Sequence, residues 1–151
     1  MGLDDLLKKD REDENEKKRA EEAKRAAKNK ADQEFRSTSN TLFNSVVRPA
    51  LESIINSFQQ NGYKANFGPQ VHHVGETSTI NSLSLNFKFR SVEALLTISS
   101  NSLMQTVNFS FAFHKFSALD YNSLYPIKEI TKEVIDKEVE DCIKKLQNQR
   151  A

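Results

Sequence analysis

Residues 83–90 read Leu-Ser-Leu-Asn-Phe-Lys-Phe-Arg (LSLNFKFR), and this stretch is the strongest indication of the fold class. Its apolar and polar residues alternate strictly, which is the period of a β-strand with one buried and one solvated face. The stretch Val107–His114 (VNFSFAFH) repeats the pattern with three phenylalanines. Both stretches predict strands of an antiparallel sheet that is covered on its apolar side only.

Two further strands are predicted, one before these two stretches and one between them. Tyr63, Ala65 and Phe67 alternate as far as Gly68-Pro69, and Val71–Val74 extends that first strand. A third strand covers 94–98, and the turn residues of 99–102 separate it from the fourth. The short connections predict a four-stranded antiparallel meander.

Helical spacing brackets the strands. Apolar residues recur every three or four positions from Leu42 to Phe58, which predicts a helix packed on the core and kinked at Pro49. Asn61-Gly62 predicts its end. Tyr125-Pro126 is expected to open the last helix, whose apolar stripe runs from Ile127 to Leu146.

Residues 1–36 differ from the rest because 22 of these 36 side chains are ionisable. Such a segment cannot bury enough apolar surface to fold alone, but its Glu, Lys, Arg and Ala residues favour helix. Ser37–Thr41 (STSNT) predicts either a break in the helix or the N-cap of the next helix. The narrow stripe formed by Ala20, Ala23, Ala27, Ala31 and Phe35 fits either a solvated, partly frayed helix or a coiled-coil arm.

The sequence therefore predicts an α+β fold in two parts, with a charged helical arm over 1–36 and a single α-β-β-β-β-α domain over 37–151. The four-stranded sheet is covered on one face by the Pro-kinked helix and the C-terminal helix. This order resembles RWD-type interaction domains, and Tyr125-Pro126 matches their Tyr-Pro turn, although the second proline of their pattern is absent. It also resembles small secretion chaperones, although those are usually acidic and this chain has a net charge of +1. Both resemblances imply protein binding.

Composition argues against several functional classes. No run approaches the roughly 20 apolar residues of a membrane span, and no secretory signal is visible. The net charge of +1 gives no general attraction to nucleic acid. Four glycines cannot form a P-loop or G-x-G-x-x-G motif, and no G-x-S-x-G occurs. We therefore expect a cytoplasmic protein that is not an enzyme and holds no cofactor.

Few residues offer metal or thiol chemistry. The candidate metal ligands are His72, His73 and His114, and adjacent histidines on a strand point to opposite faces, so one metal could not join both without a bulge. We expect no metal site. Cys142 lies on the apolar stripe of the last helix, which predicts a core residue.

Two surfaces remain as candidate binding regions. The polar face of the second strand carries Ser84, Asn86, Lys88 and Arg90, which together with the basic half of the arm predict at most weak, non-specific nucleic-acid binding. The apolar faces carry Phe87, Phe89, Phe109 and Phe111, which form either a core or the lining of a small-ligand pocket.

The sequence as a whole favours a non-enzymatic module that binds another protein or a second copy of itself, as an oligomer, adaptor or chaperone-like protein. Free sheet edges and a surplus of phenylalanine favour such contacts. A ligand-binding fold and a weak nucleic-acid binder are the alternatives.

Overall fold

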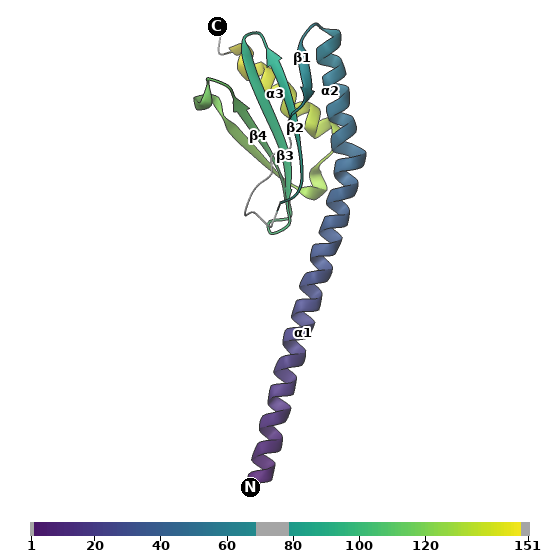
Figure 1. Cartoon of the computed structure of the whole chain (residues 1–151), viewed down its shortest axis with the longest axis vertical. Coiled ribbons are helices and arrows are strands. Elements are labelled where there is room, and N and C mark those ends of the chain that lie inside the picture. The colour runs from purple at the N-terminus through teal and green to yellow at the C-terminus, as the bar shows by residue number, and fades with distance from the viewer. Residues whose placement is uncertain (1, 69–78, 149–151) are drawn as a thin grey trace. The chain divides into compact units, whose positions relative to one another are not determined.

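The computed structural model describes residues 2–68 and 79–148, and the chain divides into two compact units, residues 1–35 and 36–151. The fold is α+β with an antiparallel sheet, as the sequence predicts (Figure 1). Its elements are α1 (Leu3–Leu42), the π-helical turn η1 (Phe43–Val47), α2 (Arg48–Gln60), β1 (Lys64–Phe67), β2 (Thr79–Phe89), β3 (Val92–Asn101), β4 (Thr106–Phe113), the 3₁₀ turn η2 (Ser117–Leu119), β5 (Tyr121–Pro126), the 3₁₀ turn η3 (Ile127–Glu129) and α3 (Lys132–Asn148).

The unit of residues 1–35 is helical from Leu3 onward, which confirms the predicted helical arm. Side chains 2–31 are all exposed. Acidic residues precede basic ones at a spacing of four, as in Asp13–Lys17 and Glu21–Arg25, and each such pair is worth about 0.2–0.5 kcal/mol. The helix therefore depends on local propensity and charge pairing. None of the helices in residues 2–68 and 79–148 combines the length and apolar character needed to cross a membrane.

The prediction of a break at Ser37–Thr41 is wrong, because α1 continues to Leu42. Ser39 is fully buried, and its hydroxyl donates a hydrogen bond to Asn81 Oδ1 at 2.5 Å and lies 2.6 Å from Ser100 Oγ. The backbone N–H of Asn81 donates to Ser100 Oγ, and its side-chain amide donates to Asn40 Oδ1, both at 3.1 Å. This Ser39 cluster joins the end of α1 to β2 and β3.

The irregularity predicted at Pro49 takes the form of the π-helical turn η1. Proline has no N–H to continue the α-helical bonds of the preceding turn. The backbone N–H of Arg48 instead donates to the carbonyl of Phe43, five residues back, and Pro49 then lies in the first turn of α2. Proline is accommodated there because the first N–H groups of a helix lack internal partners.

The predicted end of this helix at Asn61-Gly62 is confirmed. Gly62 has a φ of 83°, a left-handed conformation that glycine adopts without steric cost. The N–H of Tyr63 donates to the Phe58 carbonyl at 2.8 Å and that of Gly62 to the Gln59 carbonyl at 3.1 Å, which is the Schellman pattern.

The sheet is an antiparallel meander in the order β1-β2-β3-β4-β5, so it has five strands where four were predicted. The fifth strand, β5, pairs with β4 from Phe111↔Tyr121 to Thr106↔Pro126. Tyr125-Pro126 therefore ends an edge strand, and the prediction that it opens the last helix is wrong, since α3 begins at Lys132. Proline is tolerated at this edge because its missing N–H removes no ladder bond to a further strand.

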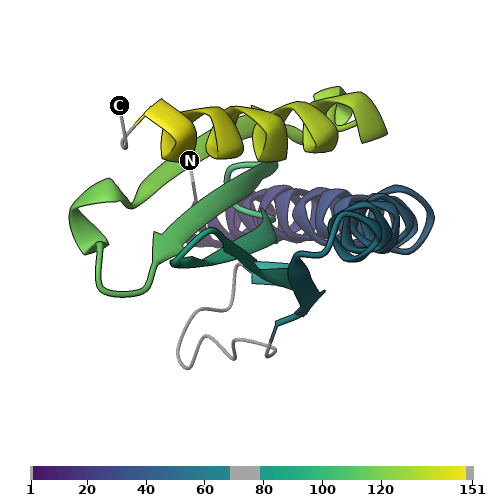
Figure 2. The same cartoon turned by 90° about the horizontal axis from the view of Figure 1, so that it is seen from above.

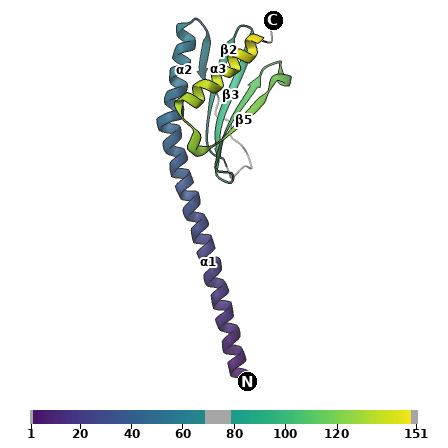
Figure 3. The same ribbon diagram turned by 180° about the vertical axis from the view of Figure 1, so that it is seen from behind.

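One hydrophobic core joins the sheet to the helices. Figure 2 shows α3 lying along one side of the sheet, and Figure 3 shows α2 and α3 from behind. Most residues of the predicted apolar stripes of both helices are buried in this core, and the others, such as Phe58 and Ile143, pack against it partly buried. The outer face of the sheet carries mainly small polar residues, among them Thr97 and Ser99 of β3 and Asn108 and Ser110 of β4.

We expect Ser39→Ala to destabilise the fold by about 1–3 kcal/mol, because it removes a hydrogen-bond partner of Asn81 and of buried Ser100. The measurement is urea unfolding of the full chain, monitored by the circular-dichroism signal of the β-sheet. Ser37→Ala is the matched control, since Ser37 is exposed on the same helix and should change stability by less than about 0.5 kcal/mol. Equal effects of the two substitutions would contradict a structural role for the cluster.

Candidate docking site

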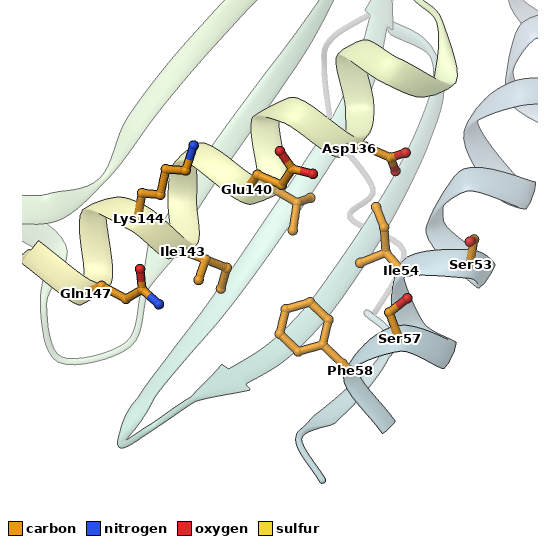
Figure 4. Close-up of a pocket in the computed structure, with 10 residues that line it drawn as sticks. Ser53, Ile54, Ser57, Phe58, Asp136, Glu140, Ile143, Lys144 and Gln147 are labelled. Atoms are coloured by element: carbon orange, nitrogen blue, oxygen red, sulfur yellow. The ribbon is translucent and has the colours of Figure 1, made fainter. Parts of the chain in front are cut away.

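A groove of about 500 Å³ lies between α2 and α3 on the helical side of the sheet (Figure 4). Four residues from one helix and six from the other line it: Ser53, Ile54, Ser57, Phe58, Asp136, Val139, Glu140, Ile143, Lys144 and Gln147. All belong to the unit of residues 36–151.

The floor of the groove is apolar. Ile54 and Phe58 are four residues apart on α2, and Val139 and Ile143 are four residues apart on α3, so each pair covers one helical turn. Ile54 and Val139 are 8% and 5% exposed, while Phe58 and Ile143 are only half-buried. The groove thus leaves apolar surface of the last two residues accessible.

The rim of the groove on α3 is charged and polarised. Asp136, Glu140 and Lys144 follow one another at intervals of four residues along α3 (Figure 4). The negative charges lie toward the start of α3 and the positive charge toward its end. On α2 the rim is formed by the hydroxyls of Ser53 and Ser57, which are neutral.

An adjoining hollow of about 220 Å³ extends the apolar surface past the end of α2. It shares Ser57, Phe58 and Ile143 with the groove, and Asn61, Tyr63 and Phe89 complete its lining. The ring centroids of Phe58 and Tyr63 are 6.0 Å apart, and those of Tyr63 and Phe89 are 5.6 Å apart. Tyr63 is 39% exposed, so an aromatic surface continues from the groove toward β2.

The polar sheet face is only partly as the sequence predicted. Asn86 and Lys88 are exposed on β2, but Ser84 is 3% exposed and its hydroxyl lies 3.2 Å from that of Thr97. Arg90 lies beyond the end of β2, where a φ of 58° places it in the turn to β3 and its guanidinium sits 5.2 Å from the Phe89 ring centre. A hollow of about 190 Å³ here is lined by Lys64, Asn66, Asn86, Phe87, Lys88 and Glu93.

The histidines are not brought together by the part of the chain that is described. His72 and His73 lie outside those residues. His114 is exposed at the end of β4, and its backbone N–H donates to the Glu93 carbonyl at 2.9 Å. Within residues 2–68 and 79–148, no three His, Cys, Asp or Glu side chains are grouped so that they could hold a metal ion.

The four phenylalanines predicted to form a core or a pocket are in the core. Phe87, Phe89, Phe109 and Phe111 are between 0% and 6% exposed and belong to one packed cluster. Sequence reasoning missed the α2–α3 groove, which uses residues at the margins of the two helical stripes. The available signal was the width of those stripes, since Phe58 and Ile143 extend them beyond what one sheet face covers.

A second polar feature lies beneath β5. The hydroxyl of Tyr125 donates a hydrogen bond to the carboxylate of Glu138, which is 6% exposed. This hydrogen bond and burial raise the pKa of Tyr125 to about 12. Neighbouring Tyr121 stacks on Phe111 with ring centroids 4.7 Å apart, and the Lys145 ammonium lies 3.6 Å from the Tyr121 ring centre.

Burial also controls the chemistry of the single thiol. Burial raises the pKa of the Cys142 thiol to about 11 and raises the pKa of the adjacent Tyr121 hydroxyl well above its usual value. Thiol nucleophiles require a lowered pKa, because the thiolate is the reactive form. The environment of Cys142, inside the core, is that of a packing residue, as its position on the helical stripe predicts.

Comparison of the chain with protein-family models, curated proteins and solved structures finds no match. The two residues that carry the resemblance to RWD-type domains, Tyr125 and Pro126, end the strand β5, and the turn η3 separates them from the last helix.

We expect Tyr125→Phe to lower the free energy of unfolding by about 1–3 kcal/mol at neutral pH, because the buried Glu138 carboxylate loses a hydrogen-bond donor. The folded chain holds the Tyr125 proton more tightly than the unfolded chain, whose tyrosines titrate near pH 10. The stabilisation is therefore complete below about pH 10 and is lost as the pH rises toward 12.

Urea unfolding of wild type and Tyr125→Phe across this pH range measures the difference directly. The gap in stability between the two proteins should be constant below about pH 9 and shrink above pH 10. Tyr63→Phe, which removes the hydroxyl of an exposed tyrosine, is the matched control and should show little gap at any pH. A gap that widens with rising pH would contradict the assignment.

Proposed function

We propose that the chain is a non-enzymatic protein-binding module, and that the α2–α3 groove receives an amphipathic helix of its partner. The observation that carries the proposal is the apolar floor with half-buried Phe58 and Ile143, framed on both sides by polar side chains. Partner-binding surfaces have this arrangement of an apolar centre and a polar rim. The proposal includes a cytoplasmic location, in keeping with the free thiol of Cys142.

The shape of the groove favours a helix over an extended peptide. A third helix can insert a ridge of side chains into the space between two helices that lie next to each other. An added strand would instead need a free sheet edge, and no sheet edge lines the groove. Phe58 and Ile143 are already half-buried, so a partner helix that covers the rest of each side chain gains only part of the about 1.5–3 kcal/mol of full burial. The two side chains still give two anchors for one partner helix.

The test uses a designed peptide of about 14 residues with leucine at positions i, i+3, i+4 and i+7, and alanine, lysine and glutamate elsewhere. We expect it to shift backbone NMR signals of α2 and α3 in the full chain. Ile143→Lys should weaken binding at least about tenfold, since it puts a charge in the apolar floor. Leu124→Lys is the control, because Leu124 is 60% exposed on β5, outside the groove.

Peptide binding with equal affinity to wild type and Ile143→Lys would contradict the use of this groove. Signals that shift along the sheet and not along α2 and α3 would contradict it as well.

A second candidate function rests on the paired lysines of β1 and β2. Lys64 and Lys88 are direct cross-strand partners, and Glu93, the partner of Lys88 on β3, lines the same hollow. Two ammonium groups against one carboxylate leave this surface with a net positive charge. Asn66 and Asn86 form the next pair and line the same hollow with their amide groups. This arrangement favours weak binding of a polyanion such as nucleic acid, as the sequence left open.

Binding of single-stranded DNA at this site should fall steeply as salt is raised. Lys64→Glu should abolish it and Lys8→Glu should not, since Lys8 belongs to the other unit of the chain. Affinity that is independent of salt would exclude this second function.

A further inference from the structure

Three exposed leucines interrupt the charge of the N-terminal helix. Leu3, Leu6 and Leu7 are 71%, 52% and 58% exposed on α1. Their spacing of i, i+3 and i+4 places them on one face of the helix. Leucines in this pattern are the usual anchors with which an amphipathic helix enters an apolar groove.

We infer that the occupant of the α2–α3 groove is the segment Leu3–Lys9 of a second copy of this chain, docked antiparallel to α3. The inference rests on the proposed function of the groove and names its partner. Length, charge and the exposure of both surfaces support it.

The apolar surfaces match in length. The first and last leucines are four residues apart, which corresponds to a rise of about 6 Å along the helix axis. The apolar residues of the floor are also four residues apart on each side, Ile54 and Phe58 on α2 and Val139 and Ile143 on α3. The leucines on one helical turn of α1 thus match the apolar residues on one helical turn of α2 and of α3.

The charges select the antiparallel direction. Asp4 lies about 100° around the helix from Leu3, and Lys8 follows one turn later on the same flank. On the rim of the groove, Glu140 and Lys144 are separated by the same four residues. Antiparallel docking brings Asp4 beside Lys144 and Lys8 beside Glu140, two attractions that outnumber the one repulsion between Glu12, a turn beyond Lys8, and Asp136. Parallel docking, with the leucines still facing the floor, would turn Asp4 and Lys8 toward the neutral Ser53 and Ser57 of α2 and lose both attractions.

The contact predicts weak and reversible self-association. A surface one helical turn long is far smaller than the roughly 1,200–2,000 Å² of stable complexes. If each copy docks its segment on the other, the two chains form a closed symmetric dimer in which the contact is made twice. We therefore expect a monomer in dilute solution and a dimer at high micromolar concentration.

The experiment is sedimentation equilibrium of the full chain from low micromolar to high micromolar concentration. Leu6→Ser together with Leu7→Ser should abolish dimerisation, with circular dichroism checking that α1 remains helical. Asp4→Lys alone and Lys144→Glu alone should each weaken it by about three- to tenfold, because each turns an attraction into a repulsion. The double variant Asp4→Lys with Lys144→Glu should restore affinity to within about twofold.

Asp5→Lys is the matched control for Asp4→Lys. It makes the same charge change in the neighbouring residue, which lies about 200° from Leu3 and so away from the leucine face. It should leave dimerisation unchanged. Equal effects of Asp4→Lys and Asp5→Lys, or no restoration in the double variant, would overturn the antiparallel contact.

The result also separates this inference from the proposed function. A full chain that stays monomeric throughout overturns the inference, and the proposed function stands if the designed peptide still binds at Ile143. A dimer that Ile143→Lys does not weaken overturns the inference by placing the interface outside the groove.

Discussion

Burial of the aromatic face of one sheet is the constraint on which the unit of residues 36–151 depends. Phe87, Phe109 and Phe111 are at most 2% exposed, and burying each side chain is worth about 1.5–3 kcal/mol. Five strands spaced about 4.8 Å apart form a surface about 19 Å wide, and a helix with its side chains is about 10 Å wide. Two helices side by side are therefore needed to cover it.

That geometry also explains why the candidate site lies where it does. The two helices diverge from each other on one face of the sheet and leave a furrow between them, whose floor comes from the edges of both apolar stripes (Figure 4). The core residues Ile54 and Val139 close the bottom of this furrow, while Phe58 and Ile143 remain accessible on its sides. Covering the sheet and offering a binding surface are thus two results of the same packing.

The sequence predicted the parts of the fold in which one residue pattern has one physical cause. The alternation in β2 and β4, the stripe of α3 and the glycine end of α2 were all recognised correctly. Prediction from the sequence failed where one residue pattern is compatible with two different structures. Ser39 and Asn40 are residue types that often end helices. Here they stay in the helix and contact Ser100 and Asn81, which are distant in the sequence. β5 was missed because Leu124 faces outward and Pro126 resembles a helix start.

The width of the apolar stripes indicated surface beyond what the sheet covers, but it did not locate the groove, because stripes identify which side chains are apolar and not how far apart two helices lie. Of the residues singled out in advance, Asn86 and Lys88 share a surface hollow, and the four phenylalanines share the core. The exposed leucines of α1 were visible in the sequence, but only the opposing floor gives them a partner of matching length.

The π-helical turn η1 sets the rotational phase of the helix on either side of it. A π-turn accommodates one residue more than the α-helix it interrupts, and one residue corresponds to about 100° of rotation. Ser39 before the turn and Leu51 after it both face the sheet with the extra residue in place. A deletion of a single residue within Phe43–Val47 would restore a regular helix and turn Ser39 away from Asn81. An insertion or deletion in Phe43–Val47 would therefore also change which residues before and after this segment face the sheet.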